Sequence, residues 1–157
     1  MIPQLSPAEA GDTEFLYQVY AGTRQDEVAA WGLDPVQQAM FLRMQFEMQR
    51  RAYALQFPGA EEYIISLEQG ERVGRLILYR MEGMTRIVDI ALLPQWRDRG
   101  IGNSLLTELQ REAAASGSGL CLNVWGDNPA QHLYRRLGFV ITAETGTGYS
   151  MEWHASA

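Results

Sequence analysis

The sequence contains no lysine, because all 13 basic residues among its 157 are arginines. This absence excludes chemistry that depends on a lysine amine, such as formation of a Schiff base. Acidic residues number 19, which gives a net charge of −6 at pH 7. A chain this acidic is not expected to bind nucleic acid as a general partner, because phosphate backbones attract basic proteins.

The sequence has a single cysteine, Cys121. One cysteine excludes an internal disulfide and leaves no cysteine cluster for a metal, so we expect no metal cofactor. Cys121 lies within the apolar run LCLNVW, which predicts a buried core residue rather than a reactive thiol.

Long apolar runs are also absent. None approaches the roughly 18 residues that a membrane-spanning helix needs. The first residues, MIPQLSPAEAGD, carry neither the basic nor the apolar stretch of a signal peptide. We therefore expect a cytoplasmic protein that does not bind membranes.

Two helices are predicted in the first 58 residues. Asp12 is suited to cap a first helix with one apolar side. Asp34 followed by Pro35 is a stronger start signal, because a capping residue precedes a proline at the first helical position. The second helix is expected to end at Phe57–Pro58.

Methionines recur along this second helix at Met40, Met44 and Met48, four residues apart. Such a stripe is typical of core packing, which is the interpretation we favour. Because methionine side chains adapt their shape, the alternative is that the stripe lines a pocket for an acceptor substrate.

The remainder of the chain predicts a mixed sheet. Three strands joined by turns at Gln69–Gly70 and Glu82–Gly83 form an antiparallel meander. A helix to about Ser116 then leads to the strand LCLNVW, which a crossover connection places parallel to the run ending at Leu93. A helix from Asn128–Pro129 and two final strands complete the order β-α-α-β-β-β-α-β-α-β-β. We expect one α/β (α+β) domain over 1–157, with helices on both faces of the sheet.

The segment PQWRDRGIGNSLL places Gly100 and Gly102 at the start of the helix that follows the third strand of the meander. The first N–H groups of a helix have no partner within it, and the helix dipole is positive there. With Arg97 and Arg99 beside the glycines, the segment has the features of a phosphate-binding loop. A P-loop would need a lysine, and a dinucleotide fingerprint would need a third glycine where Leu105 stands. A turn that serves only to connect the two elements is the remaining alternative.

This loop resembles the acyl-CoA pyrophosphate loop of the GNAT superfamily, the CoA-dependent N-acyltransferases. The pattern R-x-x-G-x-G follows the strand end Ile90-Ala91-Leu92-Leu93-Pro94. Downstream, DNPAQHLYRRLGF resembles the second motif of the family, N-x-x-A-x-x-L-Y-x-x-L-G-F. Counted back from Tyr134 the family's asparagine position holds Asp127, whereas counted from the strand it holds Asn128. We favour Asn128, as a helix cap and a contact of CoA.

The resemblance implies a GNAT fold in which two parallel strands splay apart and hold acetyl-CoA between them. Tyr134 matches the general acid that protonates the leaving thiolate, since a phenol with an ordinary pKa of about 10 is protonated at neutral pH. Asp98 is assigned a backbone role only, because a carboxylate that faced phosphates would repel them. The residues implied to bind the cofactor are Ile90, Ala91, Leu92, Arg97, Asp98, Arg99, Gly100, Ile101, Gly102, Asn103 and Asn128.

Asp89 lies in the apolar strand RIVDIALLP, where a charged residue needs an explanation. It is either a hydrogen-bonded structural carboxylate, or it faces the cleft as the catalytic base or as an anchor for the acceptor. Asn123 cannot act as a base, although it could orient the acceptor. Trp31 is assigned to aromatic packing or to the edge of the acceptor site.

The leading function is therefore transfer of the acetyl group of acetyl-CoA to a primary amine of a small molecule. Acetylation of a protein or peptide N-terminus is an alternative. A third hypothesis is a GNAT-fold module that binds acyl-CoA without catalysis. Relatives that pair through their final strands make a homodimer a further expectation.

Overall fold

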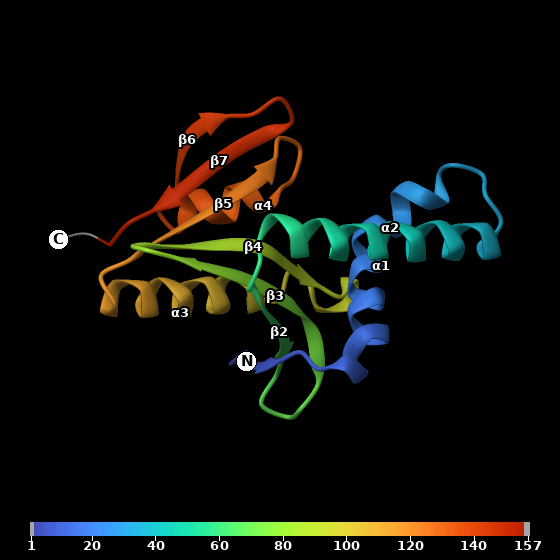
Figure 1. Cartoon of the computed structure of the whole chain (residues 1–157), viewed down its shortest axis with the longest axis horizontal. Coiled ribbons are helices and arrows are strands. Elements are labelled where there is room, and N and C mark those ends of the chain that lie inside the picture. The colour runs from blue at the N-terminus through green and yellow to red at the C-terminus, as the bar shows by residue number, and fades with distance from the viewer. Residues whose placement is uncertain (1, 156–157) are drawn as a thin grey trace. The chain divides into compact units, whose positions relative to one another are not determined.

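A computed structural model describes residues 2–155 of the chain, and its elements follow the predicted order (Figure 1). Two short 3-10 turns, Ala10–Asp12 and Pro94–Trp96, accompany them. The helices are α1 (Thr13–Ala29), α2 (Pro35–Gln56), α3 (Ile101–Ala115) and α4 (Ala130–Arg136). The strands are β1 (Gln4–Pro7), β2 (Glu61–Ser66), β3 (Arg72–Met81), β4 (Met84–Leu92), β5 (Gly119–Trp125), β6 (Val140–Glu144) and β7 (Gly148–Trp153).

The strands form one seven-stranded sheet in the order β1-β2-β3-β4-β5-β7-β6. The meander turns lie where they were predicted, with Gly70 and Gly83 at φ of 91° and 74°. The predicted parallel pair is confirmed, because Met84–Ile87 of β4 pair in parallel with residues 119–122 of β5. This pairing covers the first four residues of each strand.

Two compact units make up the chain. Unit 1 consists of Met1–Ile77 and Asp89–Asp98, and unit 2 consists of Leu78–Val88 and Arg99–Ala157. The single domain over 1–157 stays a prediction, and each unit is described by itself below. No helix among the described residues is long and apolar enough to cross a membrane.

The core of unit 1 lies between α1, α2 and the sheet. Phe46 of α2 is fully buried, and its ring contacts the rings of Tyr17 and Tyr20 from α1, with centroids 5.7 and 5.8 Å apart. Aromatic pairs at such distances add to the stabilisation that burial alone provides. The buried residues of this cluster are Leu16, Tyr20, Val28, Leu42, Phe46 and Ile64.

The start of α2 confirms the capping prediction at Asp34. Its Oδ1 accepts a hydrogen bond from Gln37 N at 2.9 Å, and Gln37 Oε1 accepts one from Asp34 N, which forms a capping box. Asp12 also precedes its helix as predicted, although its side chain does not cap it. Instead, Asp12 Oδ2 accepts from Glu9 N and Oδ1 accepts from Arg72.

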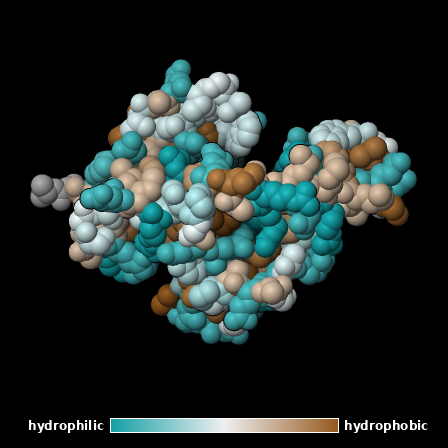
Figure 2. Space-filling view, in the orientation of Figure 1, coloured by the Kyte–Doolittle hydropathy of each residue, from teal (hydrophilic) through white to brown (hydrophobic). Residues whose placement is uncertain are grey.

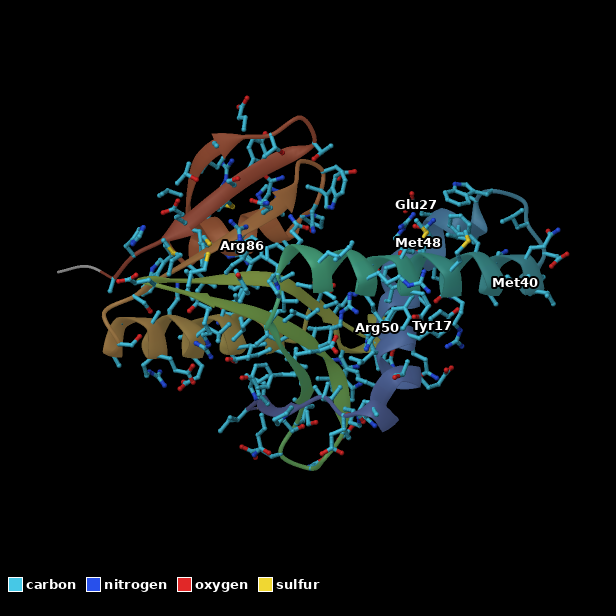
Figure 3. The ribbon with its side chains drawn as sticks, viewed as in Figure 1. Tyr17, Glu27, Met40, Met48, Arg50 and Arg86 are labelled. Carbon is cyan, nitrogen blue, oxygen red and sulfur yellow. The ribbon has the colours of Figure 1, made fainter. Side chains whose placement is uncertain are left out.

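The methionine stripe is not part of the core, so the favoured prediction for it is wrong. Met40, Met44 and Met48 are 69%, 52% and 53% exposed. Leu42 and Phe46, on another face of α2, are the residues of this helix that become buried. Apolar side chains are visible along the part of the surface that α2 forms (Figure 2), and Met40 and Met48 can be followed on the helix in Figure 3.

Within unit 1, the backbones of β3 and β4 approach closely at Gly74. A Cβ atom at this position would overlap the carbonyl oxygen of Ala91. Leu93 N donates to Val73 O at 2.8 Å and holds the end of β4 against β3. A glycine is therefore needed at Gly74 to keep the end of β4 in place.

Unit 2 is built around α3 and the last three strands, which run side by side in the order β5-β7-β6 (Figure 1). The amphipathic pattern of α3 is confirmed, since its apolar residues are buried and the helix contacts β5. Cys121 on β5 is buried as predicted, and this burial raises the pKa of its thiol. The buried residues of α3 are Ile101, Leu105, Leu106, Leu109 and Ala113.

Candidate active site

The N-terminus of α3 presents free helical N–H groups at the predicted phosphate loop. Gly100 precedes the helix at φ of 81°, a left-handed conformation that favours glycine, and it carries no side chain that could cap the helix. The first hydrogen bond within the helix runs from Ser104 N to Gly100 O at 3.0 Å. The N–H groups of Ile101, Gly102 and Asn103 come before it, so they lie at the positive end of the helix dipole. These donors fit an anionic group such as a diphosphate.

Two observations within unit 2 place α4 beside α3. A Cβ atom at Gly102 would lie 3.7 Å from Leu133 Cδ2, so the first turn of α3 lies beside α4. Gln110 Nε2, two turns further along α3, donates to Leu137 O at 2.7 Å. The helix that carries Tyr134 therefore lies next to the N-terminus of α3.

Tyr134 itself is 7% exposed, and its ring packs against Phe139 at a centroid distance of 5.6 Å. Pro129 rather than Asn128 stands at the N-cap position of α4, although Asn128 Oδ1 accepts from Ala130 N, the first residue of the helix, at 2.9 Å. Asn123 lies on β5, where its Oδ1 accepts from Ser150 Oγ at 2.9 Å.

Arg97 lies in unit 1, where its exposed guanidinium keeps its charge and binds two backbone carbonyl oxygens. Its Nε donates to Leu92 O at 3.2 Å, and its Nη2 donates to Gly22 O on α1 at 3.0 Å. The guanidinium therefore ties the segment after β4 to α1. Asp98 follows with φ of 59°, a left-handed conformation that aspartate tolerates better than most side chains.

Asp89 on β4 forms an ion pair with a buried arginine in unit 1. Arg75 Nε donates to Asp89 Oδ2 at 2.7 Å, and Arg75 Nη2 contacts the same oxygen. Nη2 also donates to Gln49 Oε1 of α2 at 2.6 Å. The Arg75 side chain is 2% exposed, whereas that of Asp89 is 22% exposed. Asp89 Oδ1 accepts no hydrogen bond from the residues that the structure describes.

Tyr53 is a half-buried phenol of the same neighbourhood, one helical turn beyond Gln49 on α2. Burial raises the pKa of Tyr53 to about 12, and the negative charge of Asp89 adds to this rise, while the positive charge of Arg75 opposes it. The phenol is therefore neutral over the whole physiological range.

Trp31 follows α1 in unit 1. Its ring packs edge-on against Phe41 with centroids 5.1 Å apart, and about half of its side chain is exposed. Both interpretations of Trp31 are compatible with this placement, because one side of the ring packs while the other remains accessible.

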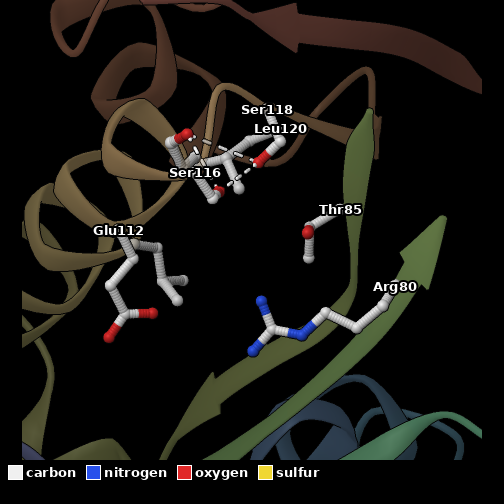
Figure 4. A pocket seen from close by; sticks show the side chains of 8 residues that line it. Arg80, Thr85, Glu112, Ser116, Ser118 and Leu120 are labelled. Atoms are coloured by element: carbon white, nitrogen blue, oxygen red, sulfur yellow. Dashed lines mark hydrogen bonds between the residues drawn. The ribbon is translucent and has the colours of Figure 1, made fainter. Parts of the chain in front are cut away.

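A small polar pocket lies in unit 2 near the C-terminal end of α3 (Figure 4). Its volume is about 30 Å³, which is enough for a water molecule but too small for a substrate. None of the predicted site residues lines it. The pocket is lined by Arg80, Thr85, Leu109, Glu112, Ala113, Ser116, Ser118 and Leu120.

Comparison with known proteins identifies the family. Residues 59–141, more than half of the chain, match the sequence profile described as the acetyltransferase (GNAT) domain. The chain belongs to the GNAT acetyltransferase family. It is accordingly an acyltransferase, and the predicted resemblance is confirmed. A comparison with curated protein sequences finds no significant match.

Solved structures of GNAT proteins share the fold over nearly the whole chain at low sequence identity. The PaiA N-acetyltransferase of Thermoplasma acidophilum, solved with coenzyme A, is 16% identical, covers 99% of this chain and 100% of its own, and has a TM-score of 0.71. A histone acetyltransferase HPA2-related protein of Corynebacterium glutamicum is 21% identical over 100% and 98%, with a TM-score of 0.69. The spermidine N-acetyltransferase of Vibrio cholerae, solved with CoA and spermine, is 18% identical over 97% and 95%, with a TM-score of 0.66.

Sequence reasoning missed two residues around Asp89 of this GNAT chain, Arg75 and Gln49. A signal for Arg75 was present, because it is a charged residue within the apolar strand RVGRLILYR. Counting outward from the Glu82–Gly83 turn places Arg75 within one residue of the position opposite Asp89. Gln49 gave no signal, since nothing in a helix sequence tells which polar residue will reach a particular strand.

No group of three or more His, Cys, Asp or Glu residues that could hold a metal occurs within residues 2–155.

Proposed function

We propose that the chain transfers the acetyl group of acetyl-CoA to the primary amine of a small molecule, by direct attack of the amine in a ternary complex. The observation that carries this proposal is the position of Gly102 beside Leu133, where a Cβ atom on Gly102 would lie 3.7 Å from Leu133 Cδ2. Unit 2 thereby combines a helix N-terminus suited to a diphosphate with the helix of Tyr134. The family membership supports the same chemistry.

Acetyl-CoA would be held by backbone groups more than by side chains. The N–H groups from Arg99 to Asn103 would bind the diphosphate, since these amides surround the positive end of α3. Asp98 would contribute its backbone only. Ile90, Ala91 and Leu92 would offer backbone groups to the pantetheine arm, which is supported by a parallel β4–β5 pairing that covers Met84–Ile87 and not the end of β4. Asn128 would contact CoA at the start of α4.

The proposed role of Tyr134 is that of the general acid. The amine nitrogen forms a bond to the carbonyl carbon of the thioester, the carbon–sulfur bond breaks, and the phenol gives its proton to the departing thiolate. The nitrogen then loses its surplus proton to solvent, and the phenolate regains one from solvent. The burial of Tyr134 supports this role, because a phenol shielded from water donates at a defined position.

Asp89 is the proposed partner of the acceptor amine, as its base or its anchor. A primary amine is mostly protonated at neutral pH and must lose a proton before it attacks. Asp89 Oδ1 is the carboxylate oxygen not used by Arg75, so it is the atom proposed to accept that proton or to bind the ammonium.

A small cationic amine is the acceptor that the charge of the chain favours, since the net charge is −6. Asn123 and Trp31 are proposed to contact it. The Vibrio cholerae relative was solved with the polyamine spermine, which supports a small amine as a class of acceptor. A cytoplasmic location and a homodimer are further parts of this proposal.

Calorimetric titration with acetyl-CoA, combined with a thiol-release assay over a panel of amines, tests the function. We expect binding of acetyl-CoA and release of CoA thiol that depends on one class of amine. Thiol release only with peptides that carry a free N-terminus would favour the second function named above. Binding without turnover on any amine or peptide would instead indicate a module that binds acyl-CoA without catalysis.

A further inference from the structure

The buried side chain of Arg75 forms an ion pair with the carboxylate of Asp89. Arg75 is 2% exposed and contacts Asp89 of β4 and Gln49 of α2 from its own position on β3. A buried guanidinium is unfavourable unless its charge is balanced and its N–H groups are bonded. Asp89 balances the charge, and Asp89 and Gln49 bind Nε and Nη2 of the guanidinium. These contacts connect three elements of unit 1 through one side chain.

Arg75 contacts only one of the two oxygens of the Asp89 carboxylate. Nε and Nη2 of Arg75 both contact Oδ2. Rotation of the Asp89 carboxylate would therefore break two charge-assisted interactions at once. Oδ1 accepts no hydrogen bond from the described residues, and the side chain remains 22% exposed. One oxygen is therefore fixed and the other remains available to a ligand.

Stability alone does not account for this pair. Buried ion pairs contribute little net stability compared with apolar residues of similar volume. In the exposed Arg43–Glu14 pair, Nη1 and Nη2 bind the two different carboxylate oxygens at 2.9 and 3.2 Å. The Arg75–Asp89 pair instead leaves a polar atom free.

We propose that Arg75, held in place by Gln49, is a positioning residue that directs Oδ1 of Asp89 toward the acceptor amine. This inference rests on the proposed function, in which Asp89 receives the amine. Arg75 acts through Asp89 and does not itself touch the substrate. Lysine would not replace it, because an ammonium group lacks the planar fork that contacts Asp89 and Gln49 together.

The other titratable groups near Asp89 do not compensate its charge. Tyr53 of α2 is a neutral phenol, since burial raises its pKa to about 12. Tyr20 of α1 accepts a hydrogen bond from Arg24 Nη1 at 3.2 Å. Arg24 in turn forms an ion pair with Glu27 at 2.8 Å. Among the residues described, Arg75 is thus the cation that contacts Asp89.

The test compares Arg75→Lys and Gln49→Met with the control Arg72→Met. Arg72 lies on the same strand and pairs with Asp12 at 2.7 Å, away from Asp89. We expect Arg75→Lys to lower kcat/KM for the amine by about ten-fold or more, with an unchanged Kd for acetyl-CoA. The KM for the amine should rise, because Oδ1 is no longer held in the position proposed to receive the amine. Gln49→Met should change both quantities in the same direction by less, and Arg72→Met should change neither.

A second readout does not depend on turnover. Carbon-13 NMR of the Asp89 carboxyl group follows its chemical shift as the amine is added to the wild-type protein, Arg75→Met and Arg72→Met, with circular dichroism as a check of folding. We expect the amine-dependent change in this signal to be lost in Arg75→Met only. If the wild type binds the amine but does not acetylate it, the proposed function fails, and this measurement still decides the role of Arg75. A folded Arg75→Lys protein with wild-type kcat and KM, or an amine-dependent change that Arg75→Met retains, would overturn the inference.

Discussion

Arg75 Nε donates to Asp89 Oδ2 at 2.7 Å, so a charge on β3 neutralises a charge on β4 in the interior of unit 1. The two strands belong to one hairpin with its turn at Glu82–Gly83. Asp89 is therefore compatible with both predicted alternatives, a structural carboxylate and a base or anchor for the acceptor. One carboxylate oxygen has a structural partner, and the other has none among the described residues.

Replacement of Asp89 by asparagine is expected to destabilise the protein by about 3 kcal/mol, because it leaves the buried Arg75 guanidinium without a counter-charge. Glu14→Gln is the matched control. It removes the carboxylate of the exposed Arg43–Glu14 pair, where water screens the interaction, so the free energy of unfolding should hardly change. Urea unfolding of the two variants measures the difference. Equal stabilities would show that the Arg75 charge does not depend on Asp89.

Tyr134→Phe is expected to lower kcat by ten-fold or more while the affinity for acetyl-CoA changes little, because the variant loses the proton donor but keeps the ring. Tyr63→Phe serves as the control. It also removes a single hydroxyl, one that donates to Glu61 at 2.5 Å on β2, in unit 1. Steady-state rates and calorimetry measure both quantities. An unchanged kcat in Tyr134→Phe would remove Tyr134 from the reaction.

Gly100→Ala and Gly117→Ala form a matched pair at the two ends of α3. Both glycines have positive φ, 81° and 71°, and a Cβ atom at either would meet nothing within 4 Å. Each substitution should therefore cost a similar amount of stability, about 1 kcal/mol, through backbone strain alone. Only Gly100→Ala alters the N–H groups that are proposed to bind the diphosphate, so it alone should weaken acetyl-CoA binding, by about ten-fold in calorimetry. Equal affinities in the two variants would place the diphosphate elsewhere.

The phenol of Tyr53 gives a prediction at high pH. Its pKa is about 12 in the folded protein, whereas an unfolded tyrosine titrates near 10. The folded state therefore holds this proton more tightly, and its contribution to stability is complete below pH 10 and is lost as the pH rises to 12. Difference absorbance of the wild type against Tyr53→Phe should show a phenol that ionises near pH 12. A difference that is complete by pH 11 would contradict the burial of Tyr53.

Much of the fold could be predicted because local signals determine it. The Asp34–Pro35 start of α2, the glycine turns at Gly70 and Gly83 and the crossover that makes β5 parallel to β4 each depend on a few neighbouring residues. The methionine stripe failed because periodicity shows only that a helix has an apolar face. Whether that face is buried depends on packing, and in α2 Leu42 and Phe46 pack while the methionines remain exposed.

The site was predictable in its motifs but not in its hydrogen bonds. Motif spacing places Gly100 directly before α3, Gly102 on α3 and Tyr134 on α4. The actual partners of charged groups depend on tertiary structure. Arg97 binds the carbonyls of Leu92 and Gly22, partners that no motif indicates. The contacts of Arg75 with Asp89 and Gln49 likewise depend on the positions of three elements.

The proposed reaction moves an acetyl group from acetyl-CoA to a primary amine of a small molecule. Mass spectrometry with carbon-13-labelled acetyl-CoA follows this transfer, together with the released CoA thiol, in the presence of the best amine of the panel. We expect labelled N-acetyl amine and free thiol in equal amounts, both formed at least ten-fold more slowly with Tyr134→Phe. Thiol release that no amine accelerates, with no labelled amide formed, would contradict it.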